Sequence, residues 1–286
     1  MQEYTVIVTV EEAAKLIEEG QAAVADCRFW LTEPERGQAA YEEGHLPGAV
    51  YFDLNRDLSS PRGVHGGRHP LPEVGEMAQK LGSSGIDRTT TVIAYDDQGG
   101  AMASRLWWLL QYFGHEGHVY VMDGGYTAWV EAGHPVSAEG PEIATRSYEP
   151  QVRPELVLHV DDIRERLGRP GVVMVDSREA DRYAGRIEPI DVKAGHIPGA
   201  VNHFWRNHLD EVGQWLPVQA QREQWEPIVQ GAEEVIVYCG SGVTACPNLL
   251  SLWQSGIKGA KLYAGSWSDW SSYSDNPVAT GEEEKA

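Results

Sequence analysis

Short apolar runs alternate along the chain with longer stretches in which apolar and polar residues mix at helical spacing. The runs are VIVTV, AAVAD, TVIAY and HVYVM in the first half, and LVLHV, VVMVD, EVIVY and AKLYA in the second. Such short, β-branched runs predict buried strands, whereas stretches such as EEAAKLIEEG and MASRLWWLLQYFG predict helices. Thr9, followed three residues later by Glu12, predicts a capping box at the start of the first helix. Strands that alternate with helices predict mostly parallel sheets flanked by helices on both faces.

The whole pattern occurs twice, in the same order and at a nearly constant offset. The matching blocks are VADCRFW with VVMVDSREA, GHLPGAVYFD with GHIPGAVNHF, TVIAYDDQGGAMASRLWWLLQYFG with EVIVYCGSGVTACPNLLSLWQSG, and VMDGGYTAWVEAGHPV with LYAGSWSDWSSYSDNPV. Four matches in one order indicate an internal repeat, so each copy predicts one domain. The expected domains span residues 1–138 and 155–286, joined by a polar, proline-bearing linker at 139–154.

Composition and charge narrow the class of protein. A length of 286 residues with 42% hydrophobic and 23% charged residues fits two soluble globular domains. The formal net charge of −20 argues against nucleic acid or an anionic membrane as the main partner. No signal peptide or membrane-length apolar run is visible, which predicts a cytoplasmic protein, and the tail GEEEKA is expected to be solvated.

The three cysteines, Cys27, Cys239 and Cys246, form neither a disulfide framework nor a zinc motif. Cys239 differs from the others because it follows a predicted strand and opens a glycine-containing loop before a helix. At such a strand end, backbone amides and the helix dipole favour negative charge on the sulfur. The expected cradle for a thiolate or persulfide is Gly240, Ser241, Gly242, Val243 and Thr244. Cys27 is interpreted as a buried hydrophobe, and Cys246 either as the same or as a redox partner two helical turns from the site.

The motif GHIPGA, the loop CGSGVTA and the duplication resemble the tandem rhodanese-domain sulfurtransferases over nearly the whole chain. Within that family the loop is most similar to that of 3-mercaptopyruvate sulfurtransferases, whereas thiosulfate sulfurtransferases typically carry basic residues there. The resemblance implies two rhodanese-like domains, of which only the second is catalytic. In the first domain Asp96 stands where the cysteine would be, and a carboxylate cannot carry a transferable sulfur atom.

A monocarboxylate such as 3-mercaptopyruvate is expected to need one or two arginines to bind its carboxylate, because the loop itself carries no charged side chain. The resemblance assigns Arg182 to substrate binding, and Arg186 is a plausible replacement for a second arginine that has no match in register. It also pairs Ser241 with His45 in substrate activation, with Glu33 or Glu35 as acidic partner, although His45 could equally be structural, like His196 in the other copy. Trp30 and the segment Arg62–His69 are further candidates for substrate contact.

The predicted reaction is a double displacement. Cys239 takes sulfur from a small anionic donor, with 3-mercaptopyruvate favoured and thiosulfate as the alternative. It then passes the sulfur to a thiol acceptor such as thioredoxin or glutathione, or to cyanide, and no metal or organic cofactor is required. A cysteine phosphatase is disfavoured because no arginine closes the loop after Ala245. A non-catalytic rhodanese-like binding or regulatory module remains the alternative from another class.

Overall fold

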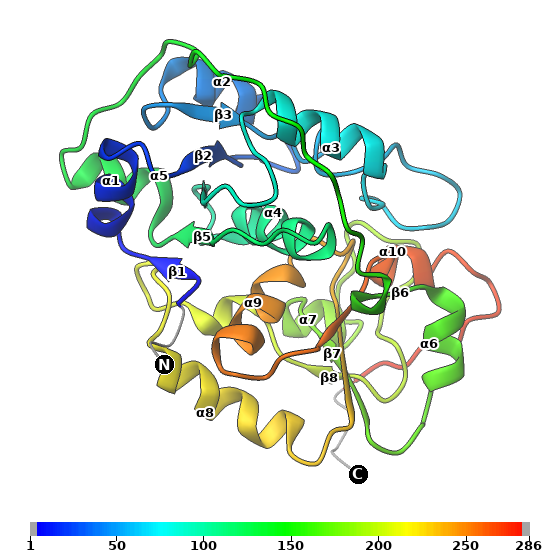
Figure 1. Ribbon diagram of the computed structural model, residues 1–286. Helices are drawn as coiled ribbons and strands as arrows, with labels where there is room; N and C mark the ends of the chain where they lie inside the picture. The colour runs from blue at the N-terminus through cyan, green and yellow to red at the C-terminus, as the bar shows by residue number, and fades with distance from the viewer. Residues whose placement is uncertain (1–4, 282–286) are drawn as a thin grey trace. The chain divides into compact units, whose positions relative to one another are not determined.

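The computed structural model describes residues 5–281, so that most of the tail GEEEKA, from residue 282, lies outside the described residues. The chain divides into two compact units, one built mainly from the first repeat and one mainly from the second. Each unit contains a five-stranded, all-parallel sheet flanked by helices (Figure 1). The strand orders are β1-β5-β4-β2-β3 and β6-β10-β9-β7-β8, which are the same order in the two units. The predicted fold class and duplication are therefore confirmed.

Unit 1 follows the predicted alternation of strands and helices. Its strands are β1 (Ile7–Val8), β2 (Ala23–Asp26), β3 (Ala49–Tyr51), β4 (Val92–Tyr95) and β5 (Val119–Met122). Its helices are α1 (Val10–Glu18), α2 (Arg36–Glu43), α3 (Val74–Ser83), α4 (Ala101–Tyr112) and α5 (Gly125–Glu131). The capping box predicted for the first helix is present, with Thr9 accepting from the Glu12 amide and Glu12 accepting from the Thr9 amide. Helix α4 is almost wholly buried, which explains its long apolar run.

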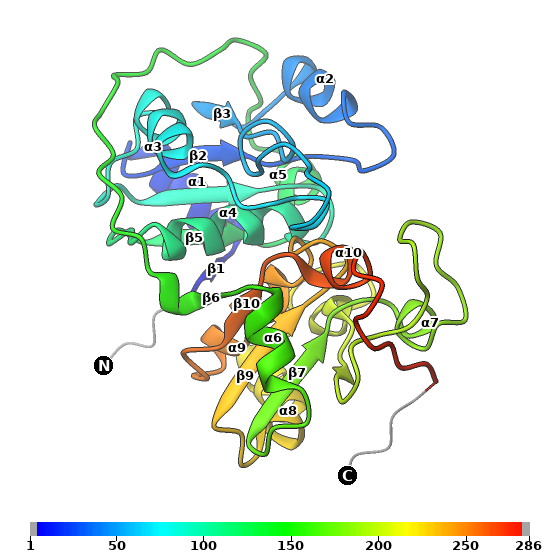
Figure 2. The ribbon, with the colours of Figure 1, turned by 90° about the vertical axis from the view of Figure 1, so that its right-hand side faces the viewer.

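Unit 2 repeats this arrangement (Figure 2). Its strands are β6 (Val157–Leu158), β7 (Val172–Asp176), β8 (Val201–Asn202), β9 (Glu234–Tyr238) and β10 (Lys261–Tyr263). Its α-helices are α6 (Val160–Arg166), α7 (Ala180–Tyr183), α8 (Val218–Val229), α9 (Cys246–Gln254) and α10 (Ser266–Trp270), with short 3-10 turns at Pro154–Leu156 and Trp205–His208. Strand β9 lies between β10 and β7, so the loop that follows it emerges from the centre of the sheet.

A buried ion pair fixes the same corner in both units. In unit 2, Arg178 binds the Asp176 carboxylate through Nε and Nη2, the latter at 2.6 Å, and both side chains are almost fully buried. In unit 1, Arg28 binds Asp26 in the same way, also at 2.6 Å. A buried charge is tolerated only when it is paired and hydrogen-bonded, so each pair makes the orientation of the chain after its strand specific. The duplication therefore extends to side-chain geometry.

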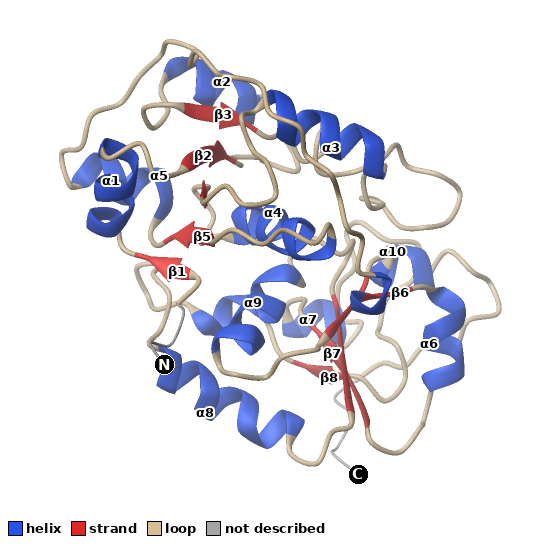
Figure 3. Cartoon of the chain, in the orientation of Figure 1, coloured by secondary structure: helices blue, strands red, loops and turns tan. Residues whose placement is uncertain are grey.

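Two short segments are exchanged between the repeats: each belongs to the unit formed mainly by the other repeat. Residues 61–70, from the first repeat, are part of unit 2, and residues 209–215, from the second repeat, are part of unit 1. Neither segment contains a named helix or strand (Figure 3). We call them strap 61–70 and strap 209–215. The first is central to the site described below.

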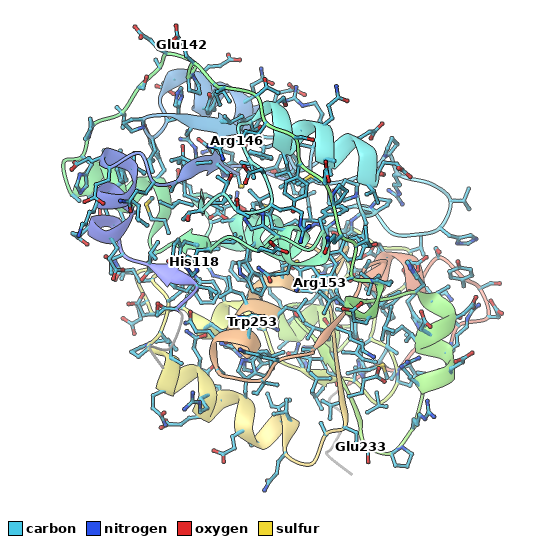
Figure 4. The ribbon with its side chains drawn as sticks, viewed as in Figure 1. His118, Glu142, Arg146, Arg153, Glu233 and Trp253 are labelled. Carbon is cyan, nitrogen blue, oxygen red and sulfur yellow. The ribbon has the colours of Figure 1, made fainter. Side chains whose placement is uncertain are left out.

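The segment predicted as a linker, 139–154, runs extended along unit 1 as far as Arg153. The Arg146 amide donates to the Gly82 carbonyl and the Gln151 amide donates to the Phe113 carbonyl, each at 2.9 Å. Glu142, Arg146 and Arg153 are labelled along this segment in Figure 4. In the part of the chain that the structure describes, no helix combines the length and the apolar character needed to cross a bilayer.

Candidate active site

Cys239 lies directly after β9, at the carboxyl end of a central parallel strand. Its side chain is buried, and the Gly242 amide donates a hydrogen bond to Sγ at 3.2 Å. Gly242 has a φ of +78°, and a Cβ there would lie 2.4 Å from the Ala264 carbonyl oxygen, so only glycine fits this turn. Helix α9 then begins at Cys246, with Pro247 in its first turn, where proline is tolerated. The loop thus turns an amide toward the sulfur, which is the geometry expected of an anion cradle.

The start of α10 holds the Cys239 loop from behind. The Trp267 and Ser268 amides donate to the carbonyl oxygens of Cys239 and Gly240, each at 2.9 Å. Ser266 accepts a hydrogen bond from the Cys239 amide at 3.1 Å and has a φ of 56°. It is the one non-glycine residue among those described with a positive φ. The left-handed conformation costs free energy in serine, and here it places a hydroxyl against the backbone amide of Cys239.

Strap 61–70 packs onto this loop and carries a histidine to it. His69 Nδ1 lies 2.7 Å from the Ser241 hydroxyl, and both side chains are buried. The Gly66 amide donates to Asp269 at 2.7 Å and the Arg68 amide donates to Ser268 at 3.1 Å, which ties the strap to α10. Gly67 has a φ of +88°, and a Cβ there would lie 2.5 Å from the Gly265 carbonyl oxygen. Gly67 is the glycine that allows this close approach, and Gly66, with a φ of +92°, allows the left-handed turn before it.

Two arginines lie against Gly240, the residue after Cys239. A Cβ built on Gly240 would lie 2.8 Å from Arg68 Nη2 and 3.6 Å from Arg182 Nη1. Arg182, the predicted substrate-binding arginine, comes from α7. Arg68 comes from strap 61–70. Asp191 forms ion pairs with both guanidinium groups.

The remaining predicted site residues lie elsewhere. Arg186 is exposed and pairs with Asp181 at 2.7 Å, so the structure brings Arg68, and not Arg186, to Gly240 beside Arg182. The loop from Arg182 to His196 turns Arg186 outward, because its amide is held by the Asp181 carbonyl.

His45 is buried in unit 1 and has the environment of a structural residue. Its Nδ1 lies 2.7 Å from the Tyr41 carbonyl, its Nε2 lies 3.2 Å from the Glu139 carbonyl, and its ring stacks on Tyr41 at 4.0 Å. His196 stacks on Tyr183 in the same way in unit 2. The histidine beside Ser241 is His69, and the contacts of His45 fit the structural alternative for that residue.

The other candidates from the first repeat belong to unit 1. Trp30 is half-buried there, with the Arg36 guanidinium 4.3 Å from its ring centroid, and Arg36 also pairs with the exposed Glu33. Cys27 is buried, and burial together with Asp26 raises the pKa of its thiol well above the ordinary value. A thiol in that environment stays protonated and unreactive.

Cys246 is buried in unit 2 at the start of α9. Its thiol donates to the Gly242 carbonyl at 3.4 Å and so braces the loop whose amide faces Cys239. The three cysteines are all free thiols. The contact with Gly242 gives Cys246 a packing role in the loop.

The loop after β4 is the counterpart in unit 1, and it is filled by its own carboxylate. Asp96 Oδ1 accepts hydrogen bonds from the Gln98 and Gly100 amides at 2.7 and 2.9 Å. Its Oδ2 accepts from the Met102 and Ala103 amides at 2.7 and 2.9 Å. Burial raises the pKa of Asp96 above its ordinary value, and these four amides offset part of that rise. The loop architecture shared by the two repeats can thus direct four amides at one anion.

Comparisons with known proteins agree with this geometry. The Rhodanese-like domain family matches residues 9–132 and 159–273, and the chain belongs to this family. It is 40% identical to a probable 3-mercaptopyruvate sulfurtransferase of Pseudomonas aeruginosa, across 96% of this chain and 98% of that protein. It is 37% identical to a putative thiosulfate sulfurtransferase of Mycobacterium tuberculosis, across 96% of this chain and 97% of that one.

The same architecture appears in a solved structure. SseA from Escherichia coli, described as a 3-mercaptopyruvate sulfotransferase, superposes with a TM-score of 0.79 at 29% identity, covering 92% of this chain and 99% of that one. This likeness and the names of the curated relatives show that the chain is a sulfurtransferase.

Proposed function

We propose that Cys239 accepts a sulfur atom from 3-mercaptopyruvate, holds it as a persulfide and passes it to a thiol or to cyanide. The observation that carries the proposal is the amide directed at Cys239 Sγ in a loop whose unit 1 counterpart holds a carboxylate with four amides. Such preorganised donors stabilise a developing anion and are each worth on the order of 10²–10³ in rate.

The first step forms an S–S bond and breaks a C–S bond. The Cys239 thiolate attacks the sulfur of 3-mercaptopyruvate, and the electron pair of the C–S bond leaves on carbon as the enolate of pyruvate. The proton of the donor's thiol ends on that carbon, so the products are pyruvate and a Cys239 persulfide anion. Ser241, which is hydrogen-bonded to His69 at 2.7 Å, would assist this proton transfer.

In the second step an acceptor thiolate attacks the outer sulfur, and the Cys239 thiolate leaves. A small thiol such as glutathione or a protein thiol such as thioredoxin fits this chemistry, and cyanide would give thiocyanate. Thiosulfate is the second candidate donor, supported by the name of the mycobacterial relative. With it, the same attack on the sulfane sulfur would release sulfite.

The test is to assay sulfur transfer from both donors with the wild type, Cys239→Ser, Cys27→Ser and Cys246→Ser. We expect Cys239→Ser to lose at least 10³-fold in turnover with both donors, because a hydroxyl cannot replace the thiolate nucleophile. Cys27→Ser should keep most of its activity. Mass spectrometry should detect one added sulfur atom on the wild type after donor treatment, and none on Cys239→Ser. A wild type that neither gains sulfur nor turns over would instead identify a non-catalytic member of the family.

A further inference from the structure

Each of the two arginines beside Gly240 is bound to buried carboxylates through one terminal guanidinium nitrogen. Arg68 uses Nη1 to bind Asp191, and Arg182 uses Nη2 to bind Glu188 at 2.7 Å and Asp191 at 3.2 Å. A Cβ on Gly240 would lie 2.8 Å from Arg68 Nη2, 3.6 Å from Arg182 Nη1 and 3.8 Å from Arg182 Nη2. Guanidinium groups from two different parts of the chain therefore lie against the residue that follows Cys239.

The same arginines have donors to spare. The Nε atoms of Arg68 and Arg182 are buried and lack a hydrogen-bond partner among the described residues. Buried donors are normally satisfied, and an exception calls for an explanation such as a bound ligand. A carboxylate is the ligand that matches guanidinium groups, because its two oxygens accept parallel hydrogen bonds.

The carboxylates behind the arginines are buried and well ordered by hydrogen bonds. Glu188 and Asp191 each expose only 3% of their side chains. Glu188 also accepts from the Ile190 and Asp191 amides at 3.1 Å and pairs with Arg178 at 3.3 Å. Arg178 is in turn bound to Asp176. The result is an alternating chain of charges that ends at Gly240.

The charges in this chain cancel. Arg68 and Arg182 contribute two positive charges, Glu188 and Asp191 contribute two negative ones, and Arg178 is neutralised by Asp176. A neutral cluster of this kind can orient a single carboxylate through hydrogen bonds. It offers no net positive charge to offset a second negative charge close by, and in a buried site that difference is large.

We propose that Arg68, carried on strap 61–70, completes with Arg182 a clamp for the donor's carboxylate, and that Asp191 sets the clamp's preference for a monoanion over a dianion. This inference rests on the proposed function. Arg68 and Arg182 contact the substrate, whereas Asp191 acts through them as a positioning residue. The clamp favours 3-mercaptopyruvate, which carries one carboxylate, over thiosulfate, which carries two negative charges.

The first experiment measures kcat and KM for 3-mercaptopyruvate in Arg68→Gln, Arg68→Lys and Arg186→Gln. Arg68→Gln should raise KM roughly 10–100-fold, the loss expected for one charge-assisted hydrogen-bonding group, with a smaller change in kcat. Arg68→Lys keeps the charge but not the planar fork, and should fall between Arg68→Gln and the wild type. Arg146→Gln is the matched control, because Arg146, labelled in Figure 4, is exposed in unit 1 and pairs with Asp87. A rise in KM for Arg186→Gln without one for Arg68→Gln would overturn the proposal.

The second experiment compares donors in Asp191→Asn. Removing this carboxylate leaves one net positive charge at the clamp, so the ratio of kcat/KM for thiosulfate to that for 3-mercaptopyruvate should rise roughly 10-fold. A purely structural role for Asp191 would lower kcat/KM for both donors by the same factor, and that result would contradict the proposal. Thermal denaturation of each variant identifies any that is unfolded, and Asp191→Glu, which keeps the charge, should restore most of the wild-type ratio.

These outcomes are separable from failure of the proposed function. If the wild type transfers no sulfur from either donor, the function itself is wrong. If the wild type is active but Arg68→Gln and Asp191→Asn leave KM and the donor ratio unchanged, the clamp alone is wrong.

Discussion

The loops after β4 and β9 share a scaffold but treat an anion in opposite ways. In unit 1 the loop closes on Asp96, whose carboxylate takes up four backbone amides. In unit 2 the loop turns the Gly242 amide toward Cys239, a side chain without a fixed charge of its own. One repeat therefore fills its loop with a carboxylate of its own, whereas the other places a thiol there. The residue at the strand end, Asp96 or Cys239, is therefore one difference between the two loops.

The two straps differ in the same sense. Strap 209–215 brings Trp215 to the Asp96 loop, where its Nε1 lies 3.1 Å from the position of a Cβ on Gly100 and its amide donates to Asp123 at 2.9 Å. Strap 61–70 brings Arg68 and His69 to the Cys239 loop. The Trp215 indole lies against the Asp96 loop, whereas the Arg68 guanidinium and the His69 imidazole lie against the Cys239 loop. If the proposed function is right, we expect sulfur transfer to depend on the strap as well as on Cys239.

The largest expected effect comes from moving the nucleophile between loops. The double variant Asp96→Cys, Cys239→Ser should stay at least 10³-fold below wild type in sulfur transfer, because the unit 1 strap supplies neither Arg68 nor His69. The assay is thiocyanate or pyruvate formation, with Cys239→Ser as reference. Activity clearly above that reference would show that a cysteine in the loop suffices, and that the straps do not matter.

Acid should destabilise unit 2 through a histidine pair that has no match in unit 1. Burial lowers the pKa of His203 to about 4 and that of His208 to about 3, and their rings lie 4.9 Å apart. In the unfolded chain the two imidazoles take up protons near pH 6.5, and in the folded chain they do not. The free energy of unfolding therefore keeps its full contribution from this pair above pH 6.5 and falls as the pH drops toward 4. The loss is on the order of 3 kcal/mol for His203 alone.

The substitution His203→Phe tests this difference, since Phe52 is the buried residue at the matching position of unit 1. Both residues donate their amide to the aspartate of the preceding strand, Phe52 to Asp26 and His203 to Asp176. Urea denaturation between pH 7 and 4 should show a shallower loss for the variant. An unchanged pH dependence would mean that other groups govern acid unfolding.

A smaller effect is expected when Asp96 loses its charge. Asp96→Asn places an NH₂ group against two amide donors that the carboxylate had satisfied, and should cost about 2 kcal/mol of the free energy of unfolding. The matched control is Asp97→Asn, because Asp97 accepts from Thr127 in a more exposed position. Chemical denaturation measures both variants. Equal costs for the two would contradict the view that the amide cradle makes Asp96 special.

The sequence was sufficient for the features that repeat. Matching blocks located both sheets, the ends of β4 and β9, and the contrast between Asp96 and Cys239, because strand periodicity and loop glycines are local signals. The sequence drew attention to His45 for the same reason, since His45 lies in a repeated motif and His69, which lies beside Ser241, does not. The position of His69 depends on how strap 61–70 docks, which is a tertiary contact between residues about 170 apart. The contact of Arg68 with Asp191 is hidden in the same way, although the segment Arg62–His69 had been a candidate.

The straps also constrain how the protein can mature during synthesis. Unit 1 is complete only when residues 209–215 are available, and strap 61–70 finds its partners between Asp191 and Ser272. The first repeat therefore cannot reach its final fold as it leaves the ribosome, because most of the second repeat must be synthesised first. Contacts so distant in sequence slow folding and prolong the exposure of intermediates. Cutting the chain between its repeats would not release two finished domains, because each fragment would keep the strap that the other needs.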